Sequence, residues 1–276
     1  MTFAEKQFIK TPERPAGVEG NFYTPKEKTT PGMNERIQRL RKQSVETKEL
    51  LSIERALITT RFYQENEGKY SVPVMRALNF LEICKHKTMY IGNDELIVAE
   101  RGPFPKSVPT FPELTCHSIE DFHVLNSRDQ QRYTIPQKDI DTYEKEVIPY
   151  WSGRTMRERI FSHVPKEWKA AYEAGVFTEF MEQRAPGHTA LDGKIYQKGM
   201  LDFKKEINDH IQQLDFLNDP EATDKLEELK AMEISCEAAI VFAERHANLA
   251  EEMVLTETNP VRIKELKQIA EVCRWV

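Results

Sequence analysis

The amino-acid sequence predicts a mostly α-helical chain with only a few short strands. Apolar residues recur at intervals of three and four over most of the 276 residues, which places them on one face of a helix. A strand-like pattern flanked by turn residues is clear in one segment, residues 89–100. Signals for tight turns are otherwise few, and this favours helices throughout the remainder of the chain.

The composition is that of a soluble globular protein. The chain is 39% hydrophobic and 9% aromatic, enough for the core of one large domain or two ordinary ones. With 39 basic against 45 acidic residues, its net charge of −6 argues against a nucleic-acid surface. No apolar stretch is long enough to cross a bilayer, and the first residues lack the apolar region of a signal peptide. We therefore expect a cytoplasmic chain with no membrane or nucleic-acid partner.

The four cysteines are too scattered for a disulfide framework or a metal site. Cys84 and Cys236 fall on apolar helical stripes and have a core explanation. Cys116 and His117 are adjacent and could share a metal or form a reactive pair. Neighbouring side chains of an extended segment face apart, however, and no second ligand cluster is nearby, so the spacing disfavours a metal site.

Residues 1–32 are predicted to be an extended, proline-rich arm. A segment so rich in proline and glycine cannot form a helix of useful length, and it lies extended over another surface or is mobile. The residues concerned are Pro12, Pro15, Gly17, Gly20, Pro25 and Pro31.

Three helices are predicted in the next part of the chain. The first begins near Asn34 on a basic amphipathic segment, and the second covers 52–63 with Ser52 as its N-cap. The third covers 72–86, with Pro73 in the first turn, where the missing N–H is harmless.

Residues 89–100 are the best strand candidate, and we expect a hairpin or a buried edge there. An apolar pair precedes a Gly92–Asp94 turn, and a short apolar run follows it. Residues 102–115 contain four prolines and predict a long irregular loop. Ser118 then suits a helix N-cap, because Asp121 fills the acidic position of a capping box.

The remaining chain is predicted to be helical apart from one turn. Pro165 suits the first turn of its helix, which has Trp168, Ala171 and Tyr172 as a buried stripe, and Asn259-Pro260 suits the start of the last helix. The predicted helices or helical stripes cover residues 138–147, 155–161, 165–174, 200–214, 229–254 and 261–272.

The turn lies in Gly175 to Thr189, which reads GVFTEFMEQRAPGHT. Pro186 has a fixed φ and Gly187 can adopt a positive one, so a rigid turn here can aim His188 in one direction. A polar residue aimed beside phenylalanines favours a pocket wall. A lone histidine beside phenylalanines is also common as a satisfied structural residue, and the spacing alone leaves both interpretations open.

The chain resembles the N-terminal part of glycyl radical enzymes of the pyruvate formate-lyase-like superfamily, and within it the trans-4-hydroxy-L-proline dehydratases. The resemblance begins at about Ser52, and its long matches are together far more specific than any one motif. They are SIERA, VPVMRALNF, NDELIVAERG, PTFPELTCHSIEDFHVLNSRD, IPYW, AAYEAGVFTEFMEQRAPGHT, YQKGMLDFKKEI and LDFLND.

This resemblance implies radical chemistry and a larger fold. The family fold is a ten-stranded α/β barrel wrapped in helices, of which residues 33–276 would form an incomplete, mostly helical part. In the family, a glycyl radical is passed to a cysteine whose thiyl radical abstracts a substrate hydrogen, and an adjacent leaving group is then lost. The dehydratases convert 4-hydroxyproline to 1-pyrroline-5-carboxylate.

The sequence departs from the family at the radical residues. It has no Arg-Val-x-Gly-Tyr-like motif, and none of its cysteines follows a glycine. The resemblance thus implies that this chain is inactive alone and is either half of a split enzyme or a truncated product. A complementary C-terminal part would carry the cysteine and the glycyl radical, which a radical S-adenosylmethionine activating enzyme would install. The complete enzyme would be a dimer, and this chain would bind no cofactor directly.

Two residues match the substrate pocket of the hydroxyproline dehydratases. The resemblance implies that Phe180 walls the pyrrolidine ring and that His188 hydrogen-bonds the leaving hydroxyl and helps to transfer a proton to it. Glu182 and Arg184 are expected to hold the turn in shape. Plain core packing remains the alternative for Phe180.

Two other functions remain open. One is a different eliminating enzyme of the superfamily, acting on a diol, choline or isethionate, although Phe180 adds no positive charge for a sulfonate. The other is a non-catalytic assembly subunit.

Overall fold

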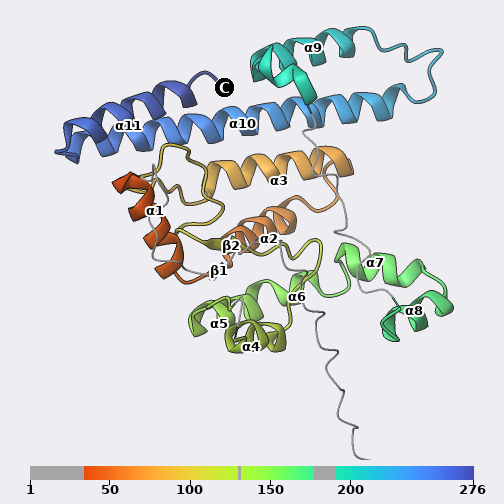
Figure 1. Cartoon of the computed structure of the whole chain (residues 1–276). Coiled ribbons are helices and arrows are strands. Elements are labelled where there is room, and N and C mark those ends of the chain that lie inside the picture. The colour runs from red at the N-terminus through yellow and green to blue at the C-terminus, as the bar shows by residue number, and fades with distance from the viewer. Residues whose placement is uncertain (1–33, 130–131, 177–190) are drawn as a thin grey trace, which may run out of the picture.

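The computed structural model describes residues 34–129, 132–176 and 191–276, and this part of the chain is mostly helical (Figure 1). The arm expected at residues 1–32 lies outside it. The longest element is α10 (Ala222–Thr256), and α11 (Pro260–Cys273) lies along it. The other helices are α1 (Glu35–Glu46), α2 (Glu54–Asn66), α3 (Val72–His86), α4 (Ile119–Ser127), α5 (Gln137–Glu146), α6 (Ile148–Trp151), α7 (Met156–His163), α8 (Lys166–Glu173) and α9 (Met200–Gln212), with a 3₁₀ turn at Asp192–Tyr196.

Small side chains on α10 let its neighbours approach closely. Ala231 of α10 packs with Val74 and Ala77 of α3, so this part of the helix is joined to α3. Further along, Ala247 and Ala250 pack with Leu266, Ile269 and Ala270 of α11. An alanine at a helix contact brings two backbones together without a loss of side-chain entropy. Helix α10 is thus the scaffold on which α3 and α11 pack, as Figure 1 shows.

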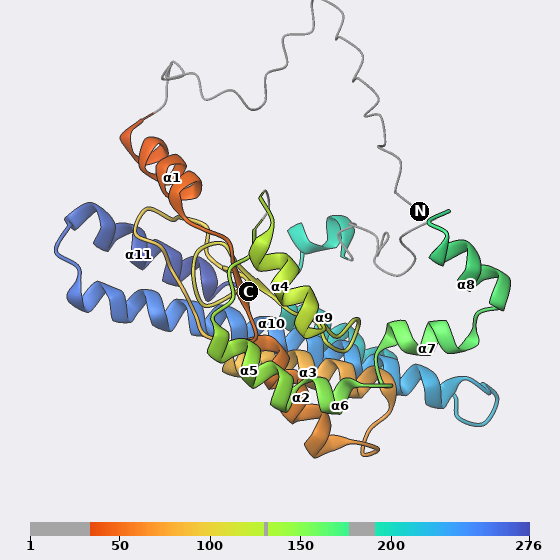
Figure 2. The same cartoon turned by 90° about the horizontal axis from the view of Figure 1, so that it is seen from below.

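A second core lies beneath α2, where α4, α5 and α6 meet it (Figure 2). Phe122 and Tyr143 are fully buried and pack edge to face, with ring centroids 4.9 Å apart. The buried indole of Trp151 donates to Thr60 Oγ1 at 2.9 Å, so its one polar atom is satisfied. Aromatic burial on this scale supplies much of the apolar driving force in a small core.

The two short strands are β1 (Leu50–Ser52) and β2 (Ser107–Pro109), which pair in parallel. Leu51 on β1 also donates its N–H to Thr134 O at 2.9 Å. The irregular loop predicted for residues 102–115 therefore contains a strand that the sequence did not reveal. The prediction that Ser52 is the N-cap of α2 is wrong. Ser52 is the last residue of β1, and Ile53 is the N-cap of α2. The Ser52 hydroxyl accepts from Glu54 N at 3.3 Å.

The prediction of a strand at residues 89–100 is wrong. This segment has no ladder, and Leu96 and Ile97 are 53% and 91% exposed. Side chains donate to some of its backbone carbonyls instead. The buried Arg262 guanidinium donates to Gly92 O at 2.7 Å and to Glu95 O at 2.8 Å. These bonds replace the ladder that the local pattern indicated.

A second arginine holds the segment that precedes residues 89–100. Arg245 on α10 donates to Cys84 O at 2.6 Å and to Lys87 O at 2.9 Å. The Lys87 ammonium, buried against α10, donates in turn to Glu100 O at 2.6 Å, and burial lowers the pKa of this lysine. The chain from the end of α3 to Glu100 is therefore fastened to the long C-terminal helices.

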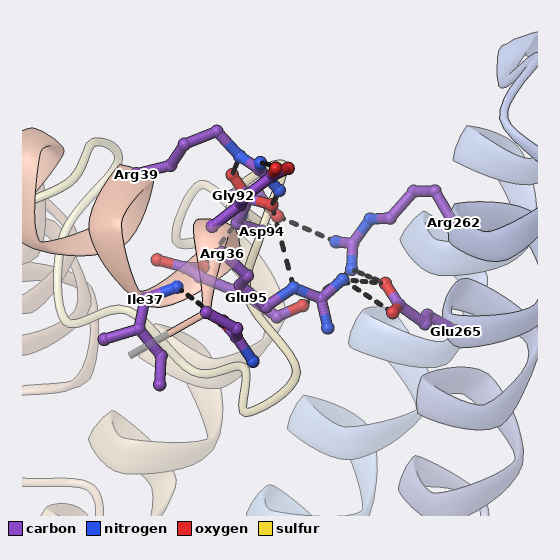
Figure 3. Close-up of polar contacts among 10 residues, drawn as sticks. Arg36, Ile37, Arg39, Gly92, Asp94, Glu95, Arg262 and Glu265 are labelled. Carbon is purple, nitrogen blue, oxygen red and sulfur yellow. Dashed lines mark hydrogen bonds and ion pairs between the residues drawn. The ribbon is translucent and has the colours of Figure 1, made fainter. Parts of the chain in front are cut away.

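An ion-pair network extends this attachment to α1 (Figure 3). Arg36 on α1 donates to both carboxylate oxygens of Glu265 on α11, at 2.6 and 2.7 Å. Arg39 donates to both oxygens of Asp94, at 2.8 and 2.7 Å. These hydrogen bonds lower the pKa of Glu265 and of Asp94. Because α1 has no buried residue, these ion pairs, and not a hydrophobic contact, hold it on the rest of the structure.

The predicted helices are confirmed in position and type. The last five predicted segments and stripes correspond to α7, α8, α9, α10 and α11, with Pro165 as the N-cap of α8 and not in its first turn. The predicted capping box is present, with Ser118 Oγ accepting from Asp121 N at 3.2 Å. None of the helices in the described residues is long and apolar enough to span a membrane.

We predict that Arg262→Ala lowers the free energy of unfolding by about 3 kcal/mol, because it leaves two backbone carbonyls without their buried donor and removes one of the two arginine partners of Glu265. Arg39→Ala is the matched control in the same network. Its side chain is 55% exposed, so a loss below about 1 kcal/mol is expected. Urea unfolding of the two variants measures the difference, and equal losses would contradict the role given to Arg262.

We also predict that Gly102→Ala destabilises the fold by about 2 kcal/mol through overpacking. A Cβ at Gly102 would lie 2.3 Å from Ser107 Oγ and 2.5 Å from Ser107 Cβ, so β2 would have to shift. Gly193→Ala is the control, because nothing lies within 4 Å of a Cβ added there. Thermal unfolding should show a lower midpoint for the first variant only, and a wild-type midpoint for Gly102→Ala would refute the contact.

Candidate functional site

The residues predicted to contact substrate, Phe180 and His188, lie outside the described residues, as do Glu182 and Arg184. What the structure describes is the element that leads to them. Helix α8 ends at Glu173 with Ala174 as its C-cap, after which Gly175 adopts a φ of +73°. Gly175 N donates to Tyr172 O and Val176 N to Ala171 O, each at 3.0 Å, which forms a Schellman motif. The glycine therefore fixes the direction in which the chain leaves α8.

An aromatic cluster joins α7 to α8. Phe161 packs edge to face on Trp168 and Tyr172, with ring centroids 5.4 and 5.1 Å away. The Arg157 guanidinium lies 4.4 Å from the centroid of Phe161 and donates to Tyr172 Oη at 3.3 Å. The stripe of Trp168, Ala171 and Tyr172 was predicted to be buried, but no residue of α8 is buried. The two helices pack on each other and stand apart from the main body in both views (Figures 1 and 2).

The start of α7 is attached to the turn that follows β2. Met156 N donates to Glu113 O and Arg157 N to Leu114 O, each at 3.0 Å. Thr155 and Glu158 form a capping box at the same end, and Glu158 Oε1 also accepts from Gly153 N at 3.0 Å. The N–H groups that a helix start leaves without partners are thus used to hold α7 on the body.

A cleft of about 670 Å³ lies between α2, α3 and α5. Its floor includes Leu57 and Phe62, and its charged groups are largely paired with neighbours. His86 Nε2 lies 3.0 Å from Glu82 Oε1, and Arg61 Nη2 lies 3.2 Å from a carboxylate of α5, Glu146. No cysteine is among the described residues that line the cleft.

Cys116 and His117 have separate partners. Cys116 Sγ lies 3.6 Å from Tyr143 Oη, whereas His117 Nδ1 lies 3.7 Å from Asp121 and its ring packs on Phe122. Burial raises the pKa of the Cys116 thiol and lowers that of His117. The two side chains thus have different polar partners, Tyr143 for Cys116 and Asp121 for His117.

The other cysteines are also packing residues. Burial raises the pKa of Cys84 to about 11, and it raises the pKa of Cys236 and Cys273 as well. A thiol that burial keeps protonated is a poor nucleophile. Sequence reasoning correctly assigned Cys84 to the core, where it is 3% exposed.

Sequence reasoning missed the structural role of Arg245 and Arg262. The sequence carries one sign of this role, which is the place of the arginine in the helical pattern of apolar residues. Arg262 precedes buried Leu266 by four residues and Ile269 by seven, so it occupies the apolar stripe of α11. A charged residue in such a register is a candidate for a buried hydrogen-bonding role.

Comparison with known proteins identifies the class of fold. The chain is 43% identical over 242 residues to trans-4-hydroxy-L-proline dehydratase of Clostridioides difficile, covering 88% of this chain and 31% of that protein. The substrate-bound crystal structure of that dehydratase matches with a TM-score of 0.83. A glycyl radical enzyme from Archaeoglobus fulgidus matches with a TM-score of 0.74 at 26% identity, over 88% of this chain and 31% of the other.

Isethionate sulfite-lyase of Oleidesulfovibrio alaskensis is 31% identical over 239 residues, covering 82% of this chain and 28% of that enzyme. The pyruvate formate lyase-like family model matches residues 30–276. The fold is thus the helical part of a glycyl radical enzyme. The chain belongs to the pyruvate formate lyase-like family, and it spans about a third of the length of the curated relatives it matches.

Proposed function

We propose that this chain is the N-terminal component of a dehydratase that removes water from trans-4-hydroxy-L-proline to give 1-pyrroline-5-carboxylate. The observation that carries the proposal is the 43% identity to the C. difficile hydroxyproline dehydratase, against 31% for the isethionate sulfite-lyase of O. alaskensis. The fold similarity supports it, with TM-scores of 0.83 for the hydroxyproline enzyme and 0.74 for the A. fulgidus enzyme.

In this proposal the radical residues belong to a complementary part. None of the four cysteines follows a glycine, and each has a thiol pKa raised by burial. The complementary part would supply the cysteine that abstracts the substrate hydrogen and the glycine that stores the radical. A radical S-adenosylmethionine activating enzyme would install that radical, and the complete enzyme would form a dimer.

This chain would contribute a wall of the substrate pocket. His188 would donate a hydrogen bond to the leaving hydroxyl and deliver a proton to it, since an imidazole titrates near neutral pH. Phe180 would pack against the pyrrolidine ring. Both residues follow α8, whose exit is set by Gly175.

A substrate panel tests the proposal. The chain, combined with a complementary part and activated anaerobically, should turn over 4-hydroxyproline and leave 1,2-propanediol, choline and isethionate unchanged. Mass spectrometry of the products identifies the reaction. Preferred turnover of another substrate would assign the chain to a different eliminating enzyme, and no turnover of any, with assembly intact, would indicate a structural subunit.

We predict that His188→Ala in this assembly lowers kcat at least 100-fold, the contribution expected of a positioned proton donor. Assembly should be unaffected, as judged by size-exclusion chromatography. His163→Ala is the control, because that histidine is exposed at the end of α7 and should not affect turnover. Full activity in His188→Ala would show that His188 is not part of the substrate pocket.

A further inference from the structure

Helix α1 is attached to the rest of the structure by charged side chains. None of its residues is buried, and none belongs to the three buried apolar clusters of the described chain. Its Val45 side chain is 76% exposed. Arg36 donates to both carboxylate oxygens of Glu265, and Arg39 donates to both oxygens of Asp94 (Figure 3). The position of α1 therefore depends on ion pairs to α11 and to the segment 89–100.

Water reaches all four side chains of these ion pairs. Their exposed fractions are 26% for Arg36, 16% for Glu265, 19% for Asp94 and 55% for Arg39. Dissolved salt screens such charges, because the Debye length falls from about 10 Å at 0.1 M to about 3 Å at 1 M ionic strength. Apolar contacts in a buried core have no charge to screen. Salt should thus weaken the attachment of α1 more than the packing of the other helices.

The chain is fixed again directly after α1. The helix ends at Glu46, and the next residue, Thr47, is its C-cap. Lys106 Nζ donates to Thr47 O at 3.3 Å and to Glu49 Oε1 at 2.8 Å. Glu49 O also accepts from Thr134 N at 2.9 Å. These bonds hold the backbone from Thr47 onward, so α1 can move only about its own C-terminal end.

The segment that receives Arg39 has a buried anchor of its own. Arg262, which is 5% exposed, donates to Gly92 O at 2.7 Å and to Glu95 O at 2.8 Å. Neither bond involves a residue of α1. Residues 89–100 can therefore stay on α11 when α1 leaves them.

A detached α1 would not remain a helix. It has 12 residues, and a helix of that length is marginal in water without tertiary contacts. We propose that α1 is a salt-sensitive strap, which opens and unfolds as one unit about Thr47 while residues 89–100 remain on α10 and α11. None of the residues given to the proposed substrate pocket belongs to the strap, so it does not depend on the proposed function.

Hydrogen exchange on the unmodified chain, read by mass spectrometry, tests the strap. The helical amides of residues 38–47 should be protected in 0.1 M NaCl and should exchange at least about 5-fold faster in 1 M NaCl. Helix α9 is the control, because its apolar stripe includes the buried Phe203 and Ile207. Exchange in α9, in α11 and in residues 89–100 should change by less than about 2-fold.

A pair of variants separates the ion pairs from a general effect of salt. Arg36→Gln removes the bonds to Glu265, so the amides of α1 should exchange as fast in 0.1 M NaCl as those of the unmodified chain do in 1 M NaCl. Arg41→Gln is the matched control. Arg41 is an exposed residue of the same helix and takes no part in the ion pairs, so this variant should exchange as the unmodified chain does.

Three results would overturn the strap. The first is equal exchange of α1 in the two salt concentrations, whether the helix is protected in both or in neither. The second is unmodified exchange in Arg36→Gln, or equal acceleration in Arg36→Gln and Arg41→Gln. The third is loss of protection in residues 89–100 or α11 together with α1, because the helix would then open only with the body of the structure.

Discussion

The segment 87–100 depends on arginine side chains, whose hydrogen bonds to its backbone carbonyls take the place of a β-ladder. Residues 87–100 run beside α10 and α11 without forming a strand, so their carbonyl groups need other donors. Arg262 binds Gly92 O and Glu95 O, and Arg245 binds Lys87 O. These contacts fix the segment to the two longest helices of the C-terminal half. The Arg36 and Arg39 ion pairs then hold α1 on the same platform, which makes α1 a polar attachment rather than a core helix.

Two cores with different chemistry flank this arrangement. Along α10 the buried contacts are made by alanines, which bring helices close. Around α2 the contacts are aromatic, with Phe122, Tyr143 and Trp151 filling a larger space. The α7–α8 pair belongs to neither core. Two backbone hydrogen bonds at the start of α7 join it to the turn after β2.

This organisation fits a chain that represents about a third of its relatives. The part described is a scaffold with many paired charges, and burial raises the pKa of its thiols, of which Cys84 is buried and the others are partly buried. Under the proposed function, its contribution would be to shape one wall of a site, which gives the exit from α8 at Gly175 its interest.

The sequence by itself determined most of the helices and the capping box of α4, because a stripe with Leu266 and Ile269, or a box such as Ser118 with Asp121, needs only neighbours within one or two turns. It also pointed to Phe180 and His188, but through family resemblance and not through spacing, and these residues lie outside the described part of the chain. Only the tertiary structure decided the strands. The β1–β2 pair joins two segments that lie about 55 residues apart in the chain. Each strand has three residues, which are too few to leave a recognisable sequence pattern. Residues 89–100 have the local pattern of a strand, yet arginines from distant helices satisfy their carbonyls first, and no local signal records a partner more than 150 residues away.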